Sequence, residues 1–399
     1  MTLDGRKALL INLGWEQRPY LDRLLALGVE VYGVHHEPLS APLPGLAELL
    51  ICPYFDTDTI TAFARRHQVE AVISDQCDYA LFASAVVSQR LGLPGPGVDA
   101  ALKTTNKYLQ RQALEGSGIR QPQYRLCLHP DDVLAFGREQ GYPLIVKPVD
   151  ARGSFGVSKV TGPAQAAEAF WAALAQSPAR QVICERFIHG TQLTVDGFCL
   201  DGIPRSLAVA SKGMLDEQRQ VAVDIHYPAR IAPGLRDKAL ANNDAVARAL
   251  GLEYGFLHGE YMLTDDGELY LIELANRGGG CHTSTHIIPA ISGINVMDAL
   301  IYAAFGQQAP CLDTASRDGV LLKFFRFERQ GRLLALAGWE DALAMPGVLT
   351  GRVNLNPGDA ITDISNDANR HGFFIVAGPE DSLHDRYQAA LARLRITVQ

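Results

Sequence analysis

Two apolar runs on either side of Asp266-Gly267 constrain the fold of this chain more than any other feature of the sequence. Asp-Gly is a preferred central pair of a two-residue type I′ turn, so the flanking runs predict a β-hairpin. Register counts outward from such a turn and places Glu260 directly opposite Glu273. The other expected pairs are Asp265 with Glu268, Thr264 with Leu269, and Met262 with Leu271.

Two glutamates that face each other inside apolar strands need a counter-charge. Their Cβ atoms would lie about 4.5–5.5 Å apart, and like charges at that spacing destabilise a sheet. Mg²⁺ prefers oxygen ligands and substrate phosphates. We therefore predict that Glu260 and Glu273 bind Mg²⁺, with Mn²⁺ as a second suitable ion. The alternative is an exposed pair on a solvated sheet face.

The hairpin runs directly into Leu274-Ala275-Asn276-Arg277 and then into three glycines, 278–280. An arginine at a strand end is a fixed cation, and glycines leave backbone N–H groups open. Together they could hold a carboxylate or an oxyanion close to the metal. The alternative is a flexible surface turn.

A second candidate site begins where the apolar run 143–146 ends at Lys147 and a loop with two glycines follows, 152–156. Glycines let backbone N–H groups approach phosphate oxygens, Ser154 adds a hydroxyl, and Lys147 supplies a cation. This is not a Walker loop, because G-x-x-x-x-G-K-[ST] is absent and no helix begins behind the glycines. The alternative is an ordinary hairpin turn with a surface lysine.

Two further segments supply candidate nucleotide contacts. Lys107 and Arg111 share one face of a helix predicted over 105–115, at i and i+4. The alternative for both is a solvated helix face. Downstream, the apolar strand in 182–188 stops at Glu185, and the hinge after it could present backbone groups or this carboxylate to the edge of an adenine ring.

Residues 1–100 alternate short apolar runs with amphipathic stretches, which predicts a parallel sheet with helices on both faces. The turn at 14–17 is not a G-x-G-x-x-G fingerprint, so a nicotinamide oxidoreductase is poorly supported. The proline–glycine cluster 93–97 predicts a domain boundary. Between 144 and 280 we expect strands and hairpins with one long helix near 235–250, and after 312 a strand-rich tail.

The net charge of −8 argues against non-specific nucleic-acid binding, which needs a basic field. The 7 cysteines are scattered without a Cys-x-x-Cys pair, which indicates reduced thiols. The N-terminus lacks the shape of a signal peptide, and no run approaches the ~20 apolar residues of a membrane span. We therefore expect a cytoplasmic protein that binds neither nucleic acid nor membrane.

The order of these motifs resembles the ATP-grasp superfamily: a lysine helix, a V-K-P strand with a glycine loop, an E-R-F-I hinge, and a glutamate hairpin that ends E-L-A-N-R-G-G-G. The resemblance covers about residues 5–310. It is strongest to the carboxylate–amine ligases, particularly the L-amino-acid ligases that make dipeptides, and the tail after 312 is similar to the C-terminal domain of that group.

This resemblance implies an ATP-grasp fold of mixed α/β and α+β type and an ATP-dependent, ADP-forming ligase. The enzyme would join a small-molecule carboxylate to an amine through an acyl phosphate, acting on amino acids or a biosynthetic intermediate, and a homodimer is common in similar enzymes. The implied parts are a Rossmann-like domain (1–98), the ATP-grasp domain (99–311, with subdomains near 120–188 and 189–311) and an α+β domain (312–399).

The family's functional residues carry over by position. The implied ATP contacts are Lys107, Lys147, Gly153, Ser154, Phe155, Gly156, Glu185, Arg186, Phe187, Ile188, Gln192 and Met262. The implied metal ligands are Glu260 and Glu273, and the implied catalytic residues are Arg277, Lys147 and Ser154. The implied substrate contacts are His258, Arg277, Gly279, Gly280 and His282.

One departure from the family concerns the second metal ligand, where many members read E-x-N. Here Ala275 stands at the asparagine position and Asn276 lies beside it. His258, which faces Ala275 on the predicted register, could fill the gap, as could water or substrate; alternatively, Asn276 reaches the metal through a bulge. Two other functions stay open: an enzyme that activates bicarbonate or a purine-pathway intermediate, and a non-catalytic ATP-binding module.

Overall fold

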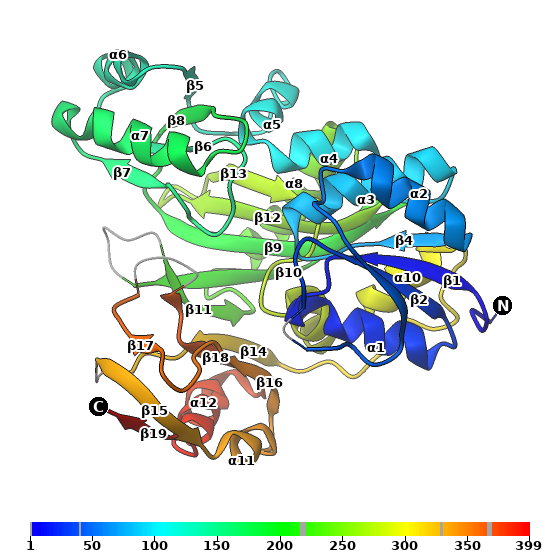
Figure 1. The fold of residues 1–399 in the computed structure, drawn as a ribbon. Coiled ribbons are helices and arrows are strands. Elements are labelled where there is room, and N and C mark those ends of the chain that lie inside the picture. Colours follow the sequence, from blue (N-terminus) through cyan, green and yellow to red (C-terminus); the bar gives the residue numbers. More distant parts are fainter. Residues whose placement is uncertain (1, 40, 216–220, 328–329, 365–368) are drawn as a thin grey trace.

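A computed structural model describes residues 2–39, 41–215, 221–327, 330–364 and 369–399. Its N-terminal part is a parallel four-stranded sheet in the order β3-β2-β1-β4, drawn in blue in Figure 1. The strands are β1 (Lys7–Ile11), β2 (Glu30–His35), β3 (Leu46–Ile51) and β4 (Ala71–Ile73); the helices are η1 (Trp15–Gln17, 3-10), α1 (Arg18–Ala26), α2 (Thr57–His67) and α3 (Asp78–Leu91).

Both faces of this sheet are covered because β1 is apolar at nearly every position. Ala8 and Leu10 pack in one cluster with side chains of α1, and Leu9 and Ile11 pack in another with side chains of α2 and α3. Side chains alternate between faces along a strand, so a continuous apolar run fills two cores. The predicted parallel sheet with helices on both faces is confirmed.

A second sheet, in the order β5-β8-β6-β7, carries the glycine loop between β6 and β7. Its elements are β5 (Tyr124–Cys127), α6 (Pro130–Gln140), β6 (Leu144–Pro148), β7 (Ser158–Val160), η2 (Pro163–Gln165, 3-10), α7 (Ala166–Gln176) and β8 (Val182–Arg186). The prediction of strands and a single helix between 144 and 280 is wrong for α7. That helix is amphipathic and buries Phe170 against the sheet, while its neighbour Trp171 is exposed.

The largest sheet is antiparallel and eight-stranded, in the order β13-β12-β9-β10-β11-β14-β18-β16. Its strands are β9 (Thr191–Leu200), β10 (Ile203–Met214), β11 (Ala222–Tyr227), β12 (Gly255–Leu263), β13 (Leu269–Ala275), β14 (Gly319–Phe324), β16 (Val348–Val353) and β18 (Gly372–Gly378). Strands on both sides of residue 311 therefore share one sheet. The domain boundaries given above stay predictions.

The remaining helices connect and cover these sheets. They are α4 (Val98–Thr105), α5 (Lys107–Ala113), α8 (Pro233–Leu250), the π-helix η3 (Thr283–Ile287), α9 (Ile288–Ser292), α10 (Val296–Ala304), α11 (Trp339–Leu343), η5 (Glu380–Ser382, 3-10) and α12 (Leu383–Leu391). A small sheet, β17-β15-β19, lies near the C-terminus: β15 (Gly331–Ala337), β17 (Ala360–Ile361) and β19 (Arg395–Val398).

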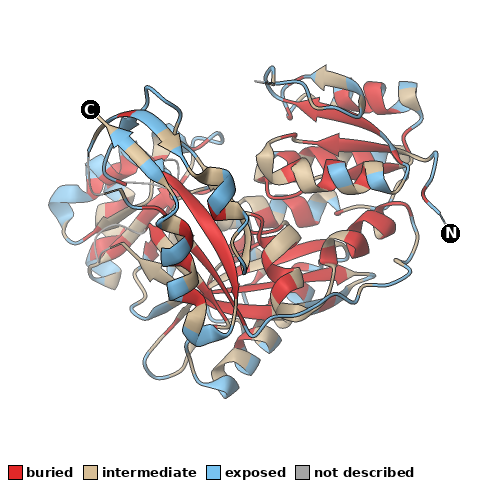
Figure 2. Cartoon of the chain, turned by 90° about the horizontal axis from the view of Figure 1, so that it is seen from below, coloured by how far each residue is buried: buried red, intermediate tan, exposed pale blue. Residues whose placement is uncertain are grey.

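Figure 2 shows the burial that results: strands form buried layers, and helices turn exposed residues outward. Within the described ranges, no helix has the length and apolar character needed to cross a membrane.

Candidate active site

The glutamate hairpin has the predicted pairing at its base but not the predicted turn. Glu260 of β12 lies opposite Glu273 of β13. At the other end Leu263 pairs with Leu269, and Gly267 in the turn between them has a φ of +79°. Thr264 N–H donates to the carbonyl of Glu268, so the turn consists of residues 265–267. A type I turn followed by a residue in the left-handed region is the usual three-residue hairpin loop, and the predicted two-residue turn is therefore wrong.

An extra residue on β13 reconciles the two ends of the hairpin. The register shifts between Glu260 and Tyr261, which leaves Ile272 as a bulge. Met262 therefore pairs with Tyr270 rather than with the predicted Leu271. The carbonyl oxygen of Ile272 accepts a hydrogen bond from Nη2 of Arg111 at 2.6 Å. The bulge therefore restores the facing glutamates.

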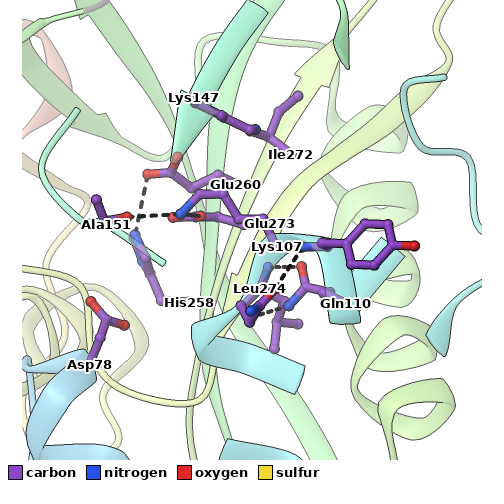
Figure 3. Close-up of polar contacts among 12 residues, drawn as sticks. Asp78, Lys107, Gln110, Lys147, Ala151, His258, Glu260, Ile272, Glu273 and Leu274 are labelled. Atoms are coloured by element: carbon purple, nitrogen blue, oxygen red, sulfur yellow. Dashed lines mark hydrogen bonds and ion pairs between the residues drawn. The ribbon is translucent and has the colours of Figure 1, made fainter. Parts of the chain in front are cut away.

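Both glutamates lie close to positively charged side chains of the protein (Figure 3). Nζ of Lys107 lies 2.9 Å from Glu273 Oε2, and Nζ of Lys212 lies 2.6 Å from Glu260 Oε1. Burial alone would raise the pKa of Glu260, but Lys212 and His258 outweigh it and hold that pKa well below its usual range. The position thus carries concentrated negative charge that is balanced by positive groups.

His258 lies between Glu260 and a buried aspartate. Its Nε2 is 3.7 Å from Glu260 Oε1, and its Nδ1 is 2.6 Å from Oδ1 of Asp196 on β9. Burial alone would lower the pKa of His258, but the carboxylates of Asp196 and Glu260 raise it to about 9. His258 is therefore an imidazolium at neutral pH in this structure.

Lys107 is positioned by a break between two helices rather than by one continuous helix. Asn106 caps α5: its Oδ1 accepts from the backbone N–H groups of Tyr108 and Leu109 at 3.0 and 3.1 Å. Lys107 is then the first residue of α5, and its backbone N–H donates to the carbonyl of Val149 at 2.8 Å. Its Nζ also donates to the carbonyl of Ala151 at 2.9 Å, so Lys107 joins the glutamate hairpin to the glycine loop (Figure 3).

The glycine loop has an open backbone. Gly153, Ser154 and Gly156 have φ values of +63°, +61° and +69°. Positive φ is accessible to glycine and uncommon for serine, so the conformation at Ser154 is held by its surroundings. Backbone N–H groups in such loops can form an anion-binding concavity.

Lys147 belongs to a buried ion network at the end of β6. Its Nζ lies 2.7 Å from Glu185 Oε2, and Nη2 of Arg111 lies 3.0 Å from Glu185 Oε1. Burial opposes ionisation of Glu185, but Arg111 and Lys147 lower its pKa. Burial lowers the pKa of Lys147 against the pull of Glu185, and Arg111 adds to that lowering. Both carboxylate oxygens of Glu185 thus bond to cations, and its predicted role at adenine stays a prediction.

Arg277 is oriented by an aspartate of the N-terminal part. Its Nε and Nη2 lie 2.8 and 3.0 Å from the two carboxylate oxygens of Asp78, the first residue of α3. The adjoining glycine run is held by the same segment: Gly278 N–H donates to Asp75 Oδ1 at 2.7 Å, and His282 N–H donates to Gln76 Oε1 at 3.0 Å. The N-terminal part therefore sets the direction of the arginine.

Asn276 does not point toward the glutamates. Its Nδ2 donates to the backbone carbonyls of Tyr254 and Phe256 at 3.0 and 2.9 Å, and its side chain is buried. Ala275 lies opposite His258, as the predicted register requires. This arrangement speaks against the explanation in which Asn276 reaches the metal through a bulge, and the filling of the gap at Ala275 by His258, water or substrate stays a prediction.

A cavity of about 580 Å³ joins these elements. Most of the predicted site residues line it: Lys107, Lys147, Gly153, Ser154, Phe155, Glu185, Arg186, Phe187, Ile188, Gln192, His258, Glu260, Met262, Glu273, Arg277 and Gly280. Gly156, Gly279 and His282 do not. His282 is buried with its ring 4.9 Å from that of Trp15, and burial lowers its pKa to about 3.

Several residues that line the cavity were not predicted from the sequence. Asp78 and Gln76 follow β4, Glu16 follows β1, and Lys212 lies on β10. In parallel α/β sheets, ligands bind beyond the carboxyl ends of the strands. The sequence could therefore have indicated the segments after β1 and β4 as parts of the site. Lys212 gives no local signal, because its partner Glu260 lies 48 residues away.

Two parts of the chain match known domain families. Residues 140–285 match the ATP-grasp domain, and residues 323–399 match the L-amino acid ligase C-terminal domain 2. The resemblance stated above to the ATP-grasp superfamily, and to L-amino-acid ligases in the C-terminal part, is confirmed.

Relatives of known sequence agree with these matches. The chain is 25% identical over 308 residues to an uncharacterized protein, y4rH, of Sinorhizobium fredii. The aligned region covers 75% of this chain and 62% of that protein. It is 32% identical over 189 residues to a D-alanine–D-alanine ligase of Aromatoleum aromaticum. That aligned region covers 46% of this chain and 60% of that protein. The chain thus spans somewhat under two thirds of the length of either relative.

Solved structures share the fold over the whole chain. An L-amino acid ligase from Bacillus licheniformis has a TM-score of 0.83 at 20% identity and covers 99% of both chains. A phosphoribosylglycinamide synthetase from Anaerococcus prevotii has a TM-score of 0.77 at 17% identity and covers 99% of this chain and 100% of that chain. The predicted ATP-grasp fold is confirmed.

Proposed function

We propose that this chain, which carries an ATP-grasp domain followed by an L-amino acid ligase C-terminal domain, is an ATP-dependent carboxylate–amine ligase. It would form an amide or peptide bond between amino acids or related small molecules and release ADP and phosphate. The observation that supports this most is the pair Glu260 and Glu273, which share a cavity with Lys107 and Lys147.

The residues present suit ATP and a divalent cation. The cavity brings two lysines and an open-backbone loop together with apolar side chains such as Phe187 and Met262. Glu260 and Glu273 each draw a lysine ammonium to within 3 Å or less, as expected of a position that favours cations. These two glutamates would hold Mg²⁺ or Mn²⁺, and the bound ion would neutralise phosphate charge as a Lewis acid.

In the first step a carboxylate oxygen of the substrate forms a bond to the γ-phosphorus of ATP, and the bond to the β-phosphate oxygen breaks. Lys107 and Lys147 are held against Glu273 and Glu185, so both cations stand in place before the nucleotide arrives. Preorganised charge of this kind stabilises a transition state without reorganisation during the reaction. The product of this step is an acyl phosphate.

In the second step the amine nitrogen attacks the carbonyl carbon of the acyl phosphate. A C–N bond forms, the C–O bond to phosphate breaks, and phosphate leaves with the electron pair. Arg277, fixed by both oxygens of Asp78, presents a cation to the oxyanion that develops. Closure of the glycine loop would exclude water, which otherwise hydrolyses the intermediate.

The test is an ADP-release screen over pairs of amino acids and amines, with mass spectrometry of the products. We expect ADP only when a carboxylate and an amine are both present, together with a product whose mass is their sum less one water. ADP formed with bicarbonate alone would instead support a carboxylating enzyme. ATP binding without ADP formation for any pair would support a non-catalytic module and refute the proposal.

A matched pair of variants on one hairpin checks the metal assignment. Glu273→Gln removes a predicted ligand and should lower turnover at least about a hundredfold. Glu268→Gln removes a glutamate beside the turn, where it pairs with Arg120 at 2.9 Å, and should leave turnover within about twofold. Equal effects of the two variants would contradict the assignment. A homodimer and a cytoplasmic location remain part of the proposal.

A further inference from the structure

Glu16 is a cavity-lining carboxylate that the reaction described above does not use. It lies on η1, directly after β1, at the carboxyl end of the parallel sheet. It lines the same cavity as Arg277, together with Gly280 and Cys281. Its Oε1 accepts the backbone N–H of Cys281 at 2.7 Å. Glu16 therefore faces the chain directly after the catalytic arginine.

Glu16 differs from most carboxylates of the cavity in having no cation partner among the described residues. Asp78, Glu185, Glu260 and Glu273 each have a lysine or arginine nitrogen within 3 Å. Among the described residues, no lysine, arginine or histidine forms an ion pair with Glu16. A carboxylate in a low-dielectric site is costly unless it is paired, so this arrangement favours a cation supplied by a ligand.

A second cavity-lining carboxylate without a cation, Asp150, is not comparable. Its two oxygens accept from the hydroxyl of Ser177 and from the backbone N–H of Ala179, so both are used by the protein itself. On Glu16, by contrast, the hydrogen bond within the described part of the chain goes to Oε1, and Oε2 is left for a ligand.

The two glycines before Cys281 bring the backbone close to Glu16 on one side and to His258 on the other. A Cβ on Gly280 would lie 3.3 Å from Oε1 of Glu16, and a Cβ on Gly279 would lie 2.8 Å from the ring of His258. His258 in turn neighbours Glu260 at 3.7 Å. The glycine run therefore lies against Glu16 at Gly280 and, at Gly279, against the histidine that neighbours the predicted metal ligand Glu260.

We propose that the Glu16 carboxylate binds the ammonium group of the amine substrate and accepts a proton from it as the nitrogen attacks. This inference rests on the proposed ligase function. The ammonium nitrogen loses two protons when it becomes an amide: one passes to Glu16 and the other to the departing phosphate or to solvent. The new C–N bond replaces the C–O bond to phosphate, as above.

The electrostatics of the site agree with a proton acceptor. Burial raises the pKa of Glu16 to about 7, despite the hydrogen bond from Cys281 and the nearby cation of Arg277. A general base works best when its pKa is close to the operating pH. Besides Arg277, the charged groups that act on Glu16 are Asp75, Arg152 and Arg352, and the titratable residues Cys281, His282 and His286 lie on the segment whose backbone N–H at Cys281 it accepts.

The test uses hydroxylamine to distinguish formation of the acyl phosphate from attack by the amine substrate. Hydroxylamine is uncharged at neutral pH and traps acyl phosphates without an ammonium-binding group. With ATP and the best carboxylate of the screen, Glu16→Gln should keep hydroxamate formation within about twofold of the wild type. With the amine substrate, amide formation should fall roughly a hundredfold or more. A parallel loss of both products, or a loss of neither, would overturn the role of Glu16.

The pH profile is a second measurement that a merely structural role would not change. The kcat/KM for the amine in the wild type should rise with pH through about 7, because Glu16 must be ionised to act. Glu16→Gln should lose this limb. Glu37→Gln, an exposed carboxylate just after β2 in the same sheet, should leave the profile and both products unchanged. An unchanged limb in Glu16→Gln contradicts the inference.

These measurements distinguish failure of the proposed ligase function from failure of the proposed role of Glu16. If the wild type forms neither hydroxamate nor ADP with any carboxylate, the ligase function itself fails and the role of Glu16 fails with it. If the wild type is active and only the behaviour of Glu16→Gln departs from expectation, the ligase function stands and the assignment of Glu16 is wrong.

Discussion

Removal of the charge on Glu185 should destabilise the glycine-loop sheet by about 3–5 kcal/mol. The carboxylate is buried, and its two oxygens lie 2.7 and 3.0 Å from Lys147 and Arg111. Glu185→Gln keeps the shape of the side chain but leaves two buried cations without a counter-ion. Breaking a buried ion pair from one side costs about this much, because the remaining charge stays desolvated.

The pH of the measurement matters because the pKa of Glu185 is lowered in the folded state. A lowered pKa means that the stabilisation is fully present above the ordinary glutamate pKa. It is lost only as the pH falls through the lower folded value. Measurement at pH 7 therefore records the whole effect.

Hydrogen exchange of the β6 and β8 amides is a suitable assay, since it reports opening of this sheet without requiring the whole chain to unfold in one step. At about 1.36 kcal/mol per tenfold, the protection of residues 144–148 and 182–186 should fall by roughly a hundredfold to several thousandfold. The control is Glu139→Gln, which breaks the exposed ion pair, 2.7 Å long, between Glu139 of α6 and Arg125 of β5. It should cost at most about 1 kcal/mol.

Equal changes in protection for Glu185→Gln and Glu139→Gln would refute the role of the buried ion network. A third variant, Lys147→Met, tests the cause. In the Lys147→Met variant, Glu185→Gln leaves one buried cation without a counter-ion instead of two. Glu185→Gln should therefore cost less stability in that variant than in the wild type, and the two substitutions should be non-additive.

Three further predictions concern the glutamate hairpin and the residues that support it. Asn276→Ala should lower the free energy of unfolding by about 1–3 kcal/mol, because one buried and one part-buried backbone carbonyl lose their donor. It should leave the magnesium dependence of ADP release unchanged, and a changed dependence would restore Asn276 as a ligand. Asp78→Asn should lower kcat more than it raises the KM for ATP, since Arg277 loses its bidentate partner, and steady-state kinetics with varied ATP checks this. Gly279→Ala should lower turnover by displacing His258, because the added Cβ would come within 2.8 Å of the imidazole ring; unaltered kinetics would contradict that contact.

The sequence predicted the features that depend on neighbours along the chain. Alternating apolar runs predicted the parallel sheet, and the Asp-Gly pair predicted a hairpin whose base brings Glu260 opposite Glu273. The turn itself was predicted wrongly. The hydroxyl of Thr264 accepts the N–H of Glu268 at 3.1 Å and also bonds to the side chain of Asp266, and these side-chain contacts accompany a three-residue loop.

The correct pairing at the base of the hairpin depended on a bulge that the local pattern does not contain. Ile272 is the extra residue, and its carbonyl is held by Arg111, which lies 161 residues earlier in the chain. The helix α7 was missed for a different reason: its sequence, AAEAFWAALAQ, is rich in strong helix formers, and this local signal was overlooked.

By itself, the sequence determined which segments become strands and most of the helices, and which residue types reach the ends of those strands. The tertiary structure alone decided which charges meet: Lys107 with Glu273, Lys212 with Glu260, and Arg277 with Asp78. It also decided that the Glu16 carboxylate lines the cavity without a cation partner among the described residues. The physical reason is distance along the chain. Periodicity records contacts between residues a few positions apart, whereas an ion pair between residues far apart in the chain exists only once separate elements pack together.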